Sequence, residues 1–77
     1  MNTKYYESGE YLQDYTLLKR TDKGIGCINQ YLDHEKTLIY NTYSISGEEF
    51  EHLSPIITEI PEAQYKIRLK LITRIGE

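Results

Sequence analysis

Three stretches of the chain that are rich in apolar residues are separated by polar turns, and each stretch is predicted to be a β-strand. The stretches are rich in β-branched and aromatic side chains and cover residues 15–21, 25–32 and 37–45. Asp22, Lys23 and Gly24 separate the first two stretches, so these should form a hairpin, because glycine can adopt the positive φ that short hairpin loops require. Successive side chains of a strand point to opposite faces. The third strand should therefore present Tyr40 on one face and Tyr43 on the other.

A change of pattern at Ser46 predicts the start of a helix. The segment from Ser46 to Glu49 has the spacing of a capping box, in which the serine hydroxyl accepts from the amide of Glu49. Pro55 does not fit inside a helix, so this helix should end near Leu53. A second short helix is expected to begin at Ser54 and to end before Pro61.

Residues 65–71 alternate strictly between apolar and basic side chains, a pattern that predicts a last β-strand. Its apolar side chains should face the core, and they are Tyr65, Ile67, Leu69 and Leu71. Its other face would carry a basic stripe formed by Lys66, Arg68 and Lys70. Ile72 falls out of this register, so the strand should bend or end there.

The predicted fold is a small two-layer α+β domain with the element order β-β-β-α-β. We expect an antiparallel sheet of three to four strands with one or two short helices packed on one of its faces. Residues 1–14 are polar with scattered tyrosines, and they are predicted to form an arm or loop. Residues 15–77 would then form the single domain.

Length and cysteine content bear on self-association and on metal binding. A chain of 77 residues has a thin stability margin, and one cysteine allows no internal disulfide. We therefore favour a homodimer over a monomer. Metal-ligand pairs such as CxxC are missing from the sequence, so no metal and no cofactor is expected.

Charge and hydropathy bear on localisation and on nucleic acid. The formal net charge is −3, which argues against a dedicated binder of the phosphate backbone. No apolar run approaches the roughly 20 residues that span a membrane, and the N-terminus lacks the apolar core of a signal peptide. We expect a cytoplasmic protein without membrane contact.

The sequence offers little for catalysis, and we predict that the protein is not an enzyme. Cys27 lies inside a predicted strand, where it is expected to be a buried small hydrophobic residue. The two histidines, His34 and His52, fall in a predicted turn and in an acidic helix. None of these residues forms a recognisable catalytic pair.

The function that the sequence favours is protein binding. The candidate contact surface is the basic stripe of Lys66, Arg68 and Lys70 with Tyr40 and Tyr43, and an acidic helix face is the alternative, formed by Glu48, Glu49 and Glu51. In size and composition the chain resembles small accessory proteins of phages and mobile elements, many of which block a host protein. That resemblance implies an inhibitor that acts by occlusion.

Two other functions remain open at this point. The first is a small nucleic-acid-binding domain, in which tyrosines of a sheet face stack on bases while a Lys/Arg stripe holds phosphates. The second is a self-associating structural protein that uses a free strand edge.

Overall fold

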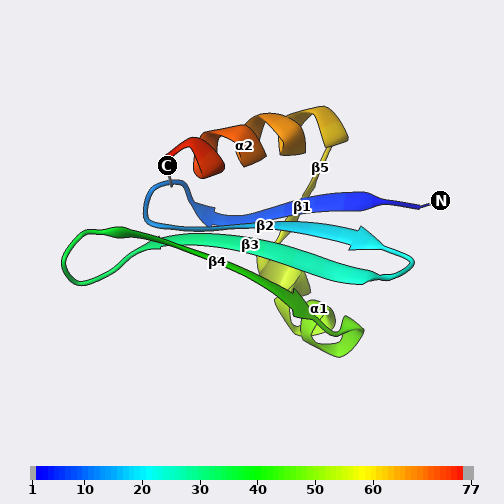
Figure 1. The fold of residues 1–77 in the computed structure, drawn as a ribbon. Coiled ribbons are helices and arrows are strands. Elements are labelled where there is room, and N and C mark those ends of the chain that lie inside the picture. The colour runs from blue at the N-terminus through cyan, green and yellow to red at the C-terminus, as the bar shows by residue number, and fades with distance from the viewer. Residues whose placement is uncertain (1, 76–77) are drawn as a thin grey trace.

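The computed structural model describes residues 2–75, and side chains through residue 72, as a five-stranded antiparallel sheet with two α-helices. In chain order the elements are β1 (Lys4–Glu10), β2 (Asp14–Thr21), β3 (Gly24–Leu32), β4 (Leu38–Ile45), α1 (Gly47–Leu53), the 3₁₀ helix η1 (Ser54–Ile56), β5 (Thr58–Ile60) and α2 (Glu62–Ile75). The strand order is β4-β3-β2-β1-β5 (Figure 1). The predicted α+β class with an antiparallel sheet is confirmed, although the sheet has five strands instead of three to four.

The three predicted strands in the middle of the sequence are confirmed. They are β2, β3 and β4, and each pairs with the next through an unbroken antiparallel register. The β2–β3 hairpin closes at the pair Thr21 and Gly24, where Gly24 has a φ of +146°. A side chain there would be strained in that backbone conformation, which explains why glycine occupies the end of this loop.

The prediction of an arm or loop over residues 1–14 is wrong, because residues 4–10 form the inner strand β1. This strand lies between β2 and β5. Its adjacent tyrosines point to opposite faces and enter different cores: the Tyr5 ring lies 4.6 Å from that of Tyr65, and the Tyr6 ring lies 5.0 Å from that of Phe50. Gly9 has a φ of +86°, and a Cβ there would lie 1.9 Å from the carbonyl oxygen of Asp14. Glycine at this position therefore permits the close approach of β1 to β2.

The predicted last strand over residues 65–71 is also wrong, because this segment belongs to helix α2. In a helix, the side chains that share a face are three or four residues apart. Tyr65 and Ile72 are buried against the sheet and Leu69 packs beside them, whereas Ile67 is 60% exposed. Ile72, which fell outside the strand register, is thus a core residue.

The helices cover opposite faces of the sheet, where we expected them on one face. Figure 1 shows α2 on one side, along β1 and β2, and α1 on the other, near the end of β4. Each helix closes its own apolar core. The α2 core is built from Tyr15, Leu17, Ile60, Tyr65 and Ile72, and the α1 core is built from Leu18, Ile25, Cys27 and Phe50.

The predicted start and end of α1 are confirmed. The hydroxyl of Ser46 accepts a hydrogen bond from the amide of Glu49 at 3.1 Å, as the capping box requires. The second short helix is the single 3₁₀ turn η1, with Pro55 in its first turn. The chain then forms the short edge strand β5, which the sequence did not indicate.

Candidate interaction surface

The exposed side of α2 carries two lysines of the predicted basic stripe and two apolar side chains that were predicted to face the core. Lys66 and Lys70 are four residues apart and share one exposed side of the helix. Ile67 and Leu71, also four apart, lie beside them, and these residues are 60% and 36% exposed. These four residues form what we call the α2 ridge.

The third member of the predicted stripe, Arg68, does not join the ridge. A helix rotates by about 100° per residue, so Arg68 lies roughly opposite Lys66 and Lys70 and faces the sheet. Its Nε atom lies 3.9 Å from Oε1 of Glu7 on β1. The same Glu7 oxygen accepts a hydrogen bond from the hydroxyl of Tyr15 at 2.5 Å. Arg68, Glu7 and Tyr15 form a polar cluster beneath α2, and sequence reasoning missed it because it placed both Glu7 and Arg68 on the wrong elements.

The polar cluster changes the acid–base properties of Tyr15. Burial of the ring raises the pKa of its hydroxyl well above the usual value near 10, and the hydrogen bond to Glu7 is the second largest cause of this increase. Burial also raises the pKa of Tyr65 in the same core. The native state therefore holds these protons at a pH where the unfolded chain has released them.

We expect the free energy of unfolding to fall as pH rises above about 10. A group whose native pKa is raised stabilises the fold fully below its unfolded pKa, and this contribution is lost as pH increases beyond that value. Urea unfolding between pH 8 and 11 measures this slope, and the Tyr15→Phe variant should show a shallower one. A stability that is constant over this range would contradict the assignment.

The two tyrosines of the predicted contact surface lie on opposite faces of β4. Tyr40 is opposite Gln30 of β3 and packs beside the α2 core, whereas Tyr43 is opposite Cys27 on the α1 face and is 45% exposed. They therefore cannot form one recognition face with the α2 ridge. Only Tyr40 is on the same side of the sheet as α2.

The alternative acidic face lies on α1, across the sheet from the α2 ridge. Glu48, Glu49 and Glu51 are all exposed. Glu48 and Glu49 occupy the first turn, where the helix dipole favours negative charge, and Glu49 takes part in the Ser46 cap. Their position thus has a local explanation in the stability of the helix.

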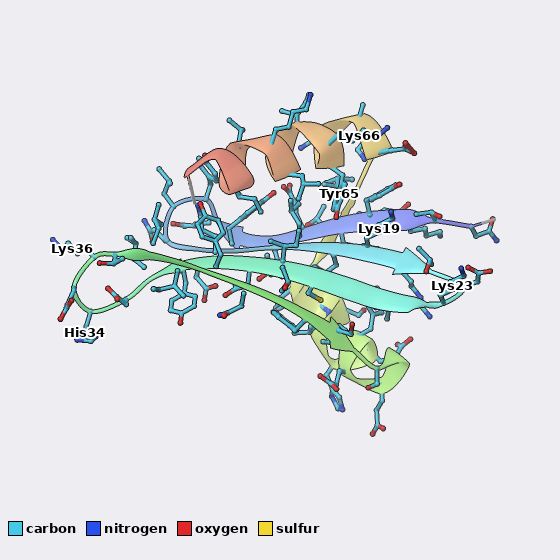
Figure 2. The ribbon with its side chains drawn as sticks, in the orientation of Figure 1. Lys19, Lys23, His34, Lys36, Tyr65 and Lys66 are labelled. Carbon is cyan, nitrogen blue, oxygen red and sulfur yellow. The ribbon has the colours of Figure 1, made fainter. Side chains whose placement is uncertain are left out.

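An open groove lies beside α2, over the half of the sheet that the helix leaves uncovered. Its volume is about 790 Å³. Its floor is made of small residues, among them Gly26, Thr42 and Ser44, and Tyr65 lies at its wall. The charged residues among its described lining are Lys19 and Lys23, both basic (Figure 2). The described charged lining of this groove is therefore basic.

The reactive side chains do not gather at this surface. His34 lies in the β3–β4 turn and His52 on α1, and Cys27 is 3% exposed in the α1 core, as its pattern predicted. Burial raises the pKa of the Cys27 thiol. Within the described residues, His, Cys, Asp and Glu form no group of three that could hold a metal ion.

The fold and the surface define a small α+β domain whose two helices lie on opposite faces of an antiparallel sheet. Within residues 2–75, neither helix is long and apolar enough to cross a membrane. Comparison of the chain with known protein families, curated proteins and solved structures finds no match.

Proposed function

We propose that this chain is a non-enzymatic protein-binding module that uses the α2 ridge to hold an acidic, amphipathic segment of a partner protein. The observation that supports this most directly is the exposure of Ile67 and Leu71 one helical turn apart, next to Lys66 and Lys70. The core already takes the other side of α2 through Tyr65 and Ile72. The apolar residues of the ridge therefore contribute little to folding and are available to a partner.

The ridge has the composition of a protein interface. Apolar anchors supply most of the affinity when a partner covers them, and burial of one such side chain contributes about 1.5–3 kcal/mol. The lysines at the margin remain wet and favour partners of opposite charge. Lys66 already pairs with Glu62 at 3.0 Å, which leaves it close to the helix surface beside Ile67.

The groove beside α2 extends the same basic surface toward β3 and β4. The hydrogen bond and the charge of Lys66 lower the pKa of Glu62 at the N-terminal end of α2, and the charge of nearby Lys19 adds a smaller effect in the same direction. A partner segment that covers the ridge could continue over Gly26 and Ser44, because their small side chains leave the groove open. Carboxylates of the partner would then meet lysines along the whole contact.

Such a module acts by occlusion, since the bound chain covers the partner's own acidic, apolar surface. This mode of action agrees with the resemblance in size and composition to the small blocking proteins of phages and mobile elements. A role as an inhibitor is part of the proposal.

We expect that Ile67→Glu removes partner binding and leaves the fold intact. The substitution places a carboxylate on the ridge, where it repels an acidic partner and cannot fill an apolar site. The measurement is affinity capture from nuclease-treated lysate with three baits: the wild type, Ile67→Glu and Ile56→Glu. Quantitative mass spectrometry then compares the proteins that each bait recovers.

Ile56→Glu is the matched control, because Ile56 is 64% exposed but lies on η1, outside the ridge, where it lines a small pocket with Glu7 and Arg68. A partner that the control retains and Ile67→Glu loses supports the proposal. Equal recovery by all three baits would refute the role of the ridge. Nucleic-acid binding also remains a prediction. If it is correct, nuclease treatment should abolish the capture, and the affinity should fall steeply as the salt concentration rises.

A further inference from the structure

Strand β4 is an edge strand without the usual protection against pairing. Among the strands in residues 2–75, only β3 pairs with it. Natural edge strands are commonly blocked by charged residues, prolines or bulges. The eight residues of β4, LIYNTYSI, include no charged residue, proline or glycine. All eight pair with β3 in continuous register, so no bulge interrupts the strand.

The register identifies the backbone groups that β4 leaves open. The amide of Leu32 donates to the carbonyl of Gln13 on the β2 side, and backbone direction alternates along a strand. The backbone amides and carbonyls of the even-numbered residues of β3 therefore point toward β2, and those of the odd-numbered residues point toward β4. Their partners on β4 are also odd-numbered. It follows that the outward amides and carbonyls of β4 belong to Leu38, Tyr40, Thr42 and Ser44.

We propose that β4 pairs with β4 of a second copy of this chain, antiparallel about a two-fold axis at Asn41. This register pairs every outward residue with another outward residue: Leu38 with Ser44, and Tyr40 with Thr42. Each of these two pairs occurs twice by symmetry, and with two bonds to a pair the interface contains about eight backbone hydrogen bonds. The result is one continuous sheet through both copies.

The side chains of β4 also suit a second copy. On the α1 face the same register sets Ile39 opposite Tyr43, an aliphatic–aromatic pair of the kind that stabilises sheets. The strand is uncharged, so two copies meet without repulsion. The axis passes between the two Asn41 residues, and each amide side chain can donate to and accept from its symmetry mate.

The opposite edge of the sheet explains why pairing stops at two copies. That edge is β5, with three residues, which is too short to template another chain. An isologous contact through β4 alone uses up the long edge of both copies and forms a closed dimer. Because α2 packs over β1 and β2, the α2 ridge stays exposed in both copies, and the dimer is independent of the proposed partner binding.

Proline substitutions test the pairing. Thr42→Pro removes an outward amide and leaves the bonds to β3, so the monomer should fold while the Kd for dimerisation rises at least about 100-fold. Asn41→Pro removes an inward amide and should destabilise the monomer itself. Sedimentation equilibrium from 1 to 100 µM gives the mass, and circular dichroism checks the fold. For the wild type we expect twice the chain mass of 9.1 kDa.

Charge exchange at Asn41 tests the position of the axis. Asn41 is exposed, so Asn41→Lys and Asn41→Asp should each fold, but each places like charges opposite one another across the axis. Each variant alone should dimerise about tenfold more weakly than wild type. An equimolar mixture of the two should recover the dimer as a heterodimer.

The outcomes separate this interface from the α2 ridge. Ile67→Glu should dimerise like the wild type whether or not it binds a partner. A wild-type chain that is monomeric at 100 µM, or that forms fibres, overturns the proposal. A dimer that survives Thr42→Pro and is lost in Ile67→Glu assigns self-association to α2 and overturns it as well.

Discussion

Replacing Ile72 with alanine should lower the free energy of unfolding by about 2–5 kcal/mol. Ile72 is fully buried between α2 and the sheet, where it packs in the core that contains Leu17 and Tyr65. Truncation leaves a cavity that rigid strands cannot close. A domain of this size has a total stability of only about 4–12 kcal/mol. Urea unfolding at one fixed protein concentration measures the loss.

Its neighbour Leu71 supplies the matched control for this experiment. Leu71 is 36% exposed on the α2 ridge, so Leu71→Ala should change the stability by less than about 1 kcal/mol. Alanine is also the best helix former, which offsets part of the lost contact. A β-strand over residues 65–71 requires the reverse order, with Leu71 as the costly position. The pair of variants therefore distinguishes helix from strand.

The reason for the misreading of α2 lies in its two apolar sides. A helix with one apolar face shows a period of 3.6 residues, which sequence reasoning detects. In α2 the core takes Tyr65, Leu69 and Ile72, while Ile67 and Leu71 add a second apolar strip on the exposed side. The two strips together imitate the alternation of a strand. The helix-favouring composition of residues 62–71 and the Glu62–Lys66 spacing were the signals that could have corrected it.

Local turn chemistry made the central part of the fold predictable. The β2–β3 hairpin follows from Asp22-Lys23-Gly24, and α1 follows from the Ser46 cap and from Pro55. These signals act within a few residues. Strand β1 pairs with its neighbour β2, but its tyrosines depend on distant partners, since they are polar enough to suit a loop until α1 and α2 cover them. No local sequence pattern distinguishes tyrosines in an exposed loop from tyrosines in a strand that two helices cover.

The candidate site was predictable in part. The sequence named Lys66 and Lys70 as contact residues, and the structure places both on the exposed side of α2. It also placed Arg68 beside them, because alternate residues share a face only in a strand. The role of Arg68 depends on Glu7, which is 61 positions away in the chain and could not be paired with it from spacing alone.

Reversal of the charge at Arg68 should therefore damage the fold, where the strand prediction implied a loss of binding alone. In Arg68→Glu the new carboxylate faces Glu7, whose oxygen already accepts from Tyr15. Two carboxylates beneath α2 repel each other and lack a cation. We expect the free energy of unfolding to fall by about 2–4 kcal/mol at pH 7, less than for a fully buried pair because both side chains are partly exposed.

Arg68→Leu separates repulsion from the simple loss of the arginine. It keeps most of the apolar stem and leaves Glu7 with its hydrogen bond from Tyr15, so the loss should stay near 1 kcal/mol. Acid should partly restore Arg68→Glu, because protonation of the introduced carboxyl removes the repulsion in the native state, whereas Arg68→Leu should show no such recovery relative to wild type. Urea unfolding of the three proteins at pH 4 and pH 7 provides the comparison. Equal stability of Arg68→Glu and wild type at pH 7 would mean that Arg68 does not face Glu7, and with that result the orientation of α2 on the sheet would have to be revised.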